Sequence, residues 1–150
     1  MKFTDGPVLW TSDEVEALEE RIGNPLPADY RGDLLTLGGG SIAERIVPDT
    51  GDNGSVHTML TPHDEQILRD GISTQYEVIP GRYHPVTLGD GGAFCIGLAD
   101  DVAGQIYWAD FDEADELGIG EGNPPSEQIM HLRYPDWRSF VEDLETFELI

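Results

Sequence analysis

The side chains best suited to chemistry in this sequence are carboxylates concentrated in its second half. No lysine or arginine occurs between Arg82 and Arg133. The acids of that stretch are Asp90, Asp100, Asp101, Asp110, Asp112, Glu113, Asp115, Glu116, Glu121 and Glu127. Such a surface can imitate the phosphates of a nucleic acid and so occupy the basic cleft of a nuclease. A solvated acidic edge is the alternative interpretation.

We predict that a partner protein binds where these acids surround an aromatic side chain. The predicted partner-binding residues are Asp100, Asp101, Trp108, Asp110, Asp112, Glu113, Asp115 and Glu116. Trp108 is included because the neighbouring Asp110 could place it at the rim of the surface, where tryptophan commonly anchors an interface. Core packing is the alternative for Trp108, since aromatic residues at strand spacing usually pack inside a protein.

The sequence gives little support for a metal site. The segment Asp49–Gly54 is similar to part of a calcium-binding loop, but it lacks the acid at the third position, and Leu60 stands where the closing glutamate belongs. A hard cation could be held by four acids if the fold gathered them: Asp100, Asp101, Asp110 and Asp112. His57 and His63 match no zinc-binding motif. We predict no metal and no cofactor.

No pattern of residues predicts catalysis. The G-x-S-x-G, H-E-x-x-H and P-loop motifs are absent from the sequence. The single cysteine, Cys95, lies among apolar neighbours, which predicts a buried and unreactive thiol. The sequence therefore favours a binding protein over an enzyme.

The net charge limits the kinds of partner. The chain of 150 residues carries 30 acidic residues against 8 lysines and arginines, for a formal charge of −22. This charge repels phosphate backbones, which disfavours nucleic-acid binding, and it attracts basic proteins. Acidity for the sake of solubility, or adaptation to a salt-rich cytoplasm, remains an alternative explanation.

Length and apolar content indicate one domain over residues 1–150. No apolar run is long enough to span a membrane, and the first residues lack the apolar core of a signal peptide. The single cysteine excludes an intramolecular disulfide and fits a reducing compartment. We therefore expect a cytoplasmic protein that does not bind membranes.

Capping signals and apolar spacing predict helices at both ends of the chain. A first helix begins after Thr11, with Glu14 completing a capping box, and ends at Gly23. A second helix follows Pro27 and stops at the glycines 38–40. A short helix begins at Thr61-Pro62, and the last begins at Asp136, an effective N-cap. Its expected buried stripe is Trp137, Phe140, Val141 and Leu144.

Strands are predicted between these helices. The clearest are residues 56–60, 93–98 and 105–109, and in the last of these Ile106 and Trp108 share one face while Tyr107 takes the other. Turn-forming residues predict a loop over 41–54 and a mobile acidic loop over 112–128. Since the strands arrive in a run, the fold class is α+β, with two N-terminal helices, an antiparallel or mixed sheet and a C-terminal helix packed on it.

Three motifs in this order resemble the SUKH superfamily, which comprises the yeast cell-wall-synthesis regulators and their bacterial relatives. They are Gly23…Leu26-Pro27…Tyr30…Leu34-Leu35 with Gly38-Gly39-Gly40, then Phe94–Leu98 with Asp100-Asp101 and Gly104–Asp110, and finally Asp136–Leu144. The chain departs from the family pattern at Gly38, where asparagine is common, and at Asp136 and Trp137, where serine and phenylalanine are usual. Aspartate replaces serine as an equivalent cap.

The resemblance implies a role as well as a fold. Bacterial SUKH proteins look like immunity proteins encoded beside polymorphic or contact-dependent toxins, which are often nucleases. We therefore expect this protein to bind and neutralise a cognate, basic toxin by blocking its cleft sterically and electrostatically. A regulatory protein-interaction module without a toxin partner is the alternative that the eukaryotic relatives suggest.

Overall fold

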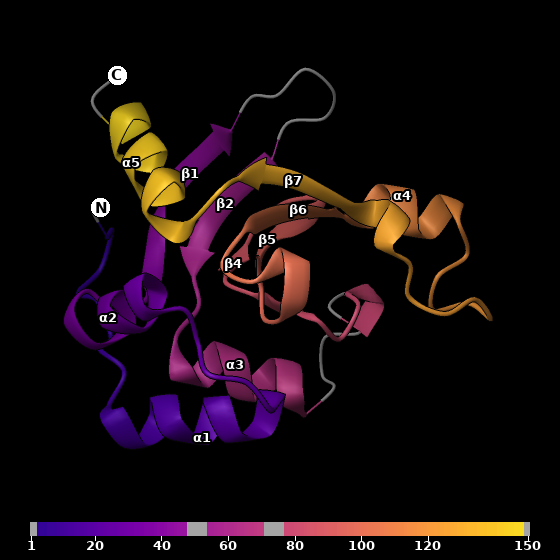
Figure 1. Cartoon of the computed structure of the whole chain (residues 1–150). Helices are drawn as coiled ribbons and strands as arrows, with labels where there is room; N and C mark the ends of the chain where they lie inside the picture. Colours follow the sequence, from indigo (N-terminus) through magenta and orange to yellow (C-terminus); the bar gives the residue numbers. More distant parts are fainter. Residues whose placement is uncertain (1–2, 48–53, 71–76, 149–150) are drawn as a thin grey trace.

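The structure, a computed structural model, describes residues 3–47, 54–70 and 77–148 (Figure 1). Its α-helices are α1 (Ser12–Ile22), α2 (Ala28–Thr36), α3 (Pro62–Arg69), α4 (Phe111–Glu116) and α5 (Trp137–Glu148). Its strands are β1 (Gly40–Val47), β2 (Gly54–Met59), β3 (Tyr83–Pro85), β4 (Thr87–Leu88), β5 (Gly92–Gly97), β6 (Ile106–Asp110) and β7 (Met130–Tyr134). No helix in these ranges is long and apolar enough to cross a membrane.

The described strands form two antiparallel sheets. One has the order β1-β2-β4 and the other β3-β5-β6-β7. In Figure 1, α1 and α3 lie side by side below the sheets, α5 lies beside β1, and α4 follows the far end of β6. The α+β prediction with an antiparallel sheet is confirmed, and the sheet is divided in two.

The predicted helix starts are confirmed by their caps. The Thr11 hydroxyl accepts from the Glu14 N–H at 3.1 Å, and the Glu14 carboxylate accepts from the Thr11 N–H at 3.0 Å. The same reciprocal pair joins Thr61 and Asp64 at the start of α3. Each cap satisfies N–H groups that the first helical turn leaves without partners.

The first correction concerns residues 41–47, which the sequence predicted as loop. They belong to β1, which pairs with β2 from Gly40 opposite Met59 to Val47 opposite Gly54. An irregularity between Ser41 and Arg45 shifts the register. Ile42 and Val47 are both buried although they are an odd number of residues apart. Burial on both parities, with turn-forming residues directly after the strand, explains why the sequence predicted a loop here.

The second correction concerns the start of the predicted acidic loop. Residues 111–116 form α4, whose N-cap is Asp110. Phe111 and Ala114, three residues apart, are buried against the sheet. The sequence analysis missed this short helix because glycines and prolines dominate the segment from Gly118 onward.

Hydrophobic clusters cover both faces of the four-stranded sheet. Alternate residues of β5 and β6 divide between them, so Phe94 and Trp108 join the larger cluster while Cys95 and Ala109 join the smaller one. Helices α1, α2 and α5 cover the larger cluster, and α4 with residues 119–129 covers the smaller one. The predicted stripe of α5 is buried as expected: Trp137, Phe140, Val141 and Leu144.

Asp136→Ala is expected to lower the free energy of unfolding, because it removes the cap of α5. The Asp136 carboxylate accepts from the Ser139 N–H at 2.8 Å, and this bond lowers the pKa of Asp136. Urea unfolding of the wild type and variant measures the loss. Asp136→Ser keeps a capping oxygen and should unfold like the wild type; equal losses in both variants would contradict the capping role.

Candidate functional site

An acidic depression opens where β6 ends and α4 begins. Its volume is about 630 Å³. Its lining consists of Asp90, Gly91, Trp108, Asp110, Asp112, Glu113 and Glu116. Every charged side chain in this lining is a carboxylate, so the hollow is a preformed site for positive charge. We call it the acidic depression below.

The local backbone explains why these carboxylates converge. Asp110 ends β6 and caps α4 through its Oδ1 atom, which accepts from the Glu113 N–H at 3.1 Å. With Phe111 buried on one side of α4, the acids of this short helix remain on the others. The turn before β5 closes the site, because the Gly91 carbonyl accepts from the Phe111 N–H at 3.0 Å. Gly91 adopts φ +76°, a left-handed backbone conformation that is strained for residues with a Cβ atom.

Trp108 forms the floor of the depression and is part of the core. Its side chain is 2% exposed, and its ring centroid lies 5.0 Å from that of Phe94. The ring also packs closely on Gly54 and Gly92, where a Cβ atom would collide with Phe94 or Trp108. The structure therefore places Trp108 beneath the acids, as scaffold, and not at an exposed rim where it could anchor a partner.

The other predicted site residues fall in different places. Asp115 is exposed on α4 but lines a separate hollow with Ile119 and Glu121. Asp100 and Asp101 are exposed in the 3-10 turn η2 (Asp100–Val102), in the connection between β5 and β6. The depression lies at the opposite end of these two strands, on the order of 13 Å away along β6.

This separation rules out the cation site considered for Asp100, Asp101, Asp110 and Asp112, because the first two lie at one end of the strand pair and the last two at the other. Asp101 also has a cationic partner, since its carboxylate contacts Arg82 at 2.9 Å. Arg82 contacts Glu127 as well. Asp101 is thus partly neutralised by an arginine, whereas no arginine or lysine lines the depression.

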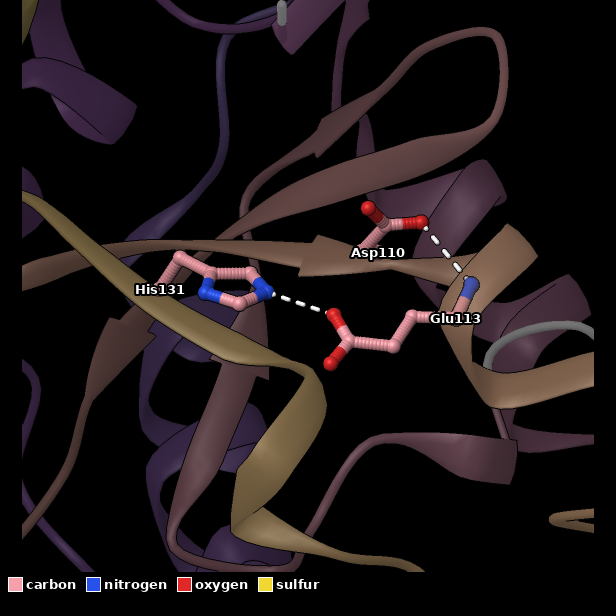
Figure 2. A group of neighbouring side chains, drawn as sticks. All are labelled: Asp110, Glu113 and His131. Carbon is pink, nitrogen blue, oxygen red and sulfur yellow. Dashed lines mark hydrogen bonds and ion pairs between the residues drawn. The ribbon is translucent and has the colours of Figure 1, made fainter. Parts of the chain in front are cut away.

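His131 is a site residue that the sequence analysis missed. Its Nε2 atom lies 2.7 Å from Oε2 of Glu113, and Asp110 stands beside both (Figure 2). One donor atom from each of Asp110, Glu113 and His131 lies within 4.8 Å of the others. These three residues could hold a metal ion. His131 reaches the site because β7 pairs with β6 in a register that sets it opposite Trp108.

Two other reactive side chains are buried away from the depression. Burial raises the pKa of the Cys95 thiol well above its ordinary value, so the thiol stays protonated. Burial, and to a smaller extent the charge of Arg21, lowers the pKa of His84 to about 4. The segment Asp49–Gly54, whose partial similarity to a calcium loop the sequence analysis disfavoured, falls almost wholly on residues 48–53, which lie outside the described residues.

Comparison with known proteins identifies a family. The family model described as SMI1 / KNR4 family (SUKH-1) matches residues 10–143. That range includes the first two motifs of the sequence analysis, the third except for its last residue, Leu144, and the whole acidic depression. No curated protein matches the chain.

Proposed function

This chain belongs to the SMI1/KNR4 family (SUKH-1), and on that premise we propose that it is an immunity protein that neutralises a basic, nuclease-type bacterial toxin in the cytoplasm. The protein acts by binding and performs no reaction. The acidic depression receives cationic side chains that line the toxin's cleft. Substrate is then excluded sterically by the bound domain and electrostatically by its carboxylates.

The observation that carries the proposal is the convergence of five carboxylates on one open hollow. They are Asp90, Asp110, Asp112, Glu113 and Glu116. Each contact between unit charges 4 Å apart is worth roughly 1 to 4 kcal/mol near a protein surface, before desolvation. A partner with a cluster of lysines or arginines makes several of these favourable charge contacts at once. The field of the carboxylates also steers that partner toward the hollow before contact.

Tight binding also requires an apolar centre from which water is excluded. Trp108 is too buried to provide it. Among the described residues the exposed large apolar side chains are Val8, Leu9, Leu37 and Leu132. Of these, Leu132 alone lies in the four-stranded sheet that carries the depression, on strand β7 at its edge, where it is 56% exposed. Leu132 pairs with Tyr107, whereas His131 pairs with Trp108, so Leu132 lies on the face of the sheet opposite Trp108 and we assign no apolar contact of the interface to it.

Protection of cells tests the proposal. The product of the gene adjacent to this one is expressed from an inducible promoter together with the wild type or with a variant in which Asp90→Asn, Asp112→Asn and Glu116→Gln neutralise the depression. We expect the wild type to restore growth. The variant should bind at least about tenfold more weakly and protect poorly, because the rim charges have been removed.

A matched variant controls for total charge. Asp13→Asn, Glu16→Gln and Glu20→Gln remove three exposed carboxylates from α1, outside the depression. This variant should protect like the wild type. Equal protection by both triple variants would refute the depression as the binding surface. Failure of the wild type to bind the neighbouring product would favour a regulatory interaction module instead.

A further inference from the structure

We propose that Asp110, Glu113 and His131 form a binding site for a divalent transition-metal ion of the zinc class. The inference goes beyond the proposed function, since it concerns an ion and not a protein partner. Two carboxylates and one imidazole offer donor atoms within 4.8 Å of one another, from the end of β6, from α4 and from β7 (Figure 2). Three protein donors and one open position are typical of zinc sites that bind a further ligand.

Asp110 gives independent support, because its carboxylate is buried without a cation. The residue is 5% exposed, and among the described residues only the Glu113 N–H donates to its side chain. That bond occupies Oδ1, while the side chain also lines the depression. The other oxygen, Oδ2, accepts no hydrogen bond from the described residues, which leaves it available to a cation in the depression.

To admit an ion, the His131–Glu113 pair must open slightly, and donor atoms as far as 4.8 Å apart must approach by up to about 1.5 Å. Nε2 of His131 lies 2.7 Å from Oε2 of Glu113. In a tetrahedral zinc site with bonds of about 2.0–2.1 Å, neighbouring donor atoms stand roughly 3.3 Å apart. The side chains of His131 and Glu113 are 43% and 26% exposed, so both can rotate to make these movements.

Ion binding changes the proton arrangement of this pair. The hydrogen bond between His131 and Glu113 uses a proton on Nε2 when the carboxylate is ionised. When the metal binds Nε2, the ring keeps one proton, on Nδ1: a neutral ring moves its proton there from Nε2, and a protonated ring releases its Nε2 proton to solvent. The carboxylates of Asp110 and Glu113 supply the two negative charges that balance a divalent ion.

The donor set discriminates between classes of cation. Calcium takes six to eight oxygen ligands, whereas an imidazole nitrogen suits zinc, copper, nickel and related ions. The fourth position faces the depression, where water or a side chain of a partner can occupy it. Neutralising two of the five carboxylates that line the hollow also makes it less attractive to a cationic partner.

Metal titration of the purified chain, without a histidine tag, tests the site and needs no toxin. Zn²⁺ is followed by calorimetry and Co²⁺ by its visible absorption. We expect one ion per chain. Asp110→Asn and His131→Asn should each lower the affinity at least about tenfold. Asparagine remains an effective N-cap, so Asp110→Asn should keep α4, and circular dichroism checks that both variants are folded.

His63→Asn is the control, because His63 is an exposed histidine on α3 outside the cluster. It should bind Zn²⁺ like the wild type. Three results would overturn the proposal: no binding of Zn²⁺ or Co²⁺ by the wild type, unchanged binding by His131→Asn, or Ca²⁺ binding as tight as that of Zn²⁺. None of them bears on protection against a toxin, so this site and the proposed function fail separately.

Discussion

Trp108→Ala is expected to lower the free energy of unfolding by about 3–5 kcal/mol, the usual range for truncating a buried tryptophan. The indole is 2% exposed and packs on Phe94 at a centroid distance of 5.0 Å. Its removal leaves a cavity between the larger hydrophobic cluster and the acidic depression, and the surrounding strands can fill that cavity only in part. Urea unfolding at neutral pH measures the effect.

Trp108→Phe is the matched control, since it keeps an aromatic ring on the same face of β6 and should lose less stability than the alanine variant. Partner binding distinguishes scaffold from anchor. A folded Trp108→Phe protein should retain most of its affinity for the toxin. A loss of stability below about 1 kcal/mol in Trp108→Ala, with a large loss of binding, would contradict the buried position and restore Trp108 as an interface residue.

Lowering the pH from 7 to 5 is expected to cost about 2 kcal/mol of stability through His84 alone. The pKa of this buried imidazole is lowered from 6.5 to about 4, and within the described residues its Nε2 atom has no hydrogen-bond partner. The unfolded chain therefore binds a proton below about pH 6.5 while the folded chain does not. The stability contributed by the neutral ring is present above that pH and is lost as the pH falls toward 4.

His84→Leu isolates this effect, because every other titrating group is shared with the wild type. Unfolding free energies of both proteins are measured in urea between pH 7.5 and pH 5 (approximate limits that stay above the sequence pI of about 4.1). The wild type should lose about 2 kcal/mol more than the variant over that range. Parallel pH profiles would show that His84 does not titrate as its buried position requires.

The features predicted correctly from sequence are those with local physical causes. The Thr11 cap depends on a residue three positions away, and the stripe from Trp137 to Leu144 depends on helical periodicity, so neither needs knowledge of the rest of the chain. Strand β1 was missed because its buried residues Ile42 and Val47 do not alternate and turn-forming residues follow it. Helix α4 was missed because it is short and directly followed by glycines.

The site was only partly predictable, because some of its residues are brought together by local structure and one by a contact between distant strands. Asp110, Asp112, Glu113 and Glu116 are close in the sequence, and α4 keeps them close in space. His131 joins them through the pairing register of β6 and β7, which sets it opposite Trp108. Local sequence patterns do not determine this register. The alternation of β6 assigned Trp108 to a face correctly, but it could not indicate that both faces of the sheet are covered.

The association rate of the protein with the neighbouring gene product, measured against ionic strength, tests the central claim that the acidic depression is the docking surface. Between about 0.01 M and 1 M salt the Debye length falls from about 30 Å to about 3 Å. The account predicts a rate that falls steeply with salt in the wild type and in the α1 control variant, and a shallow dependence after Asp90→Asn, Asp112→Asn and Glu116→Gln. The same steep dependence in all three proteins would contradict it.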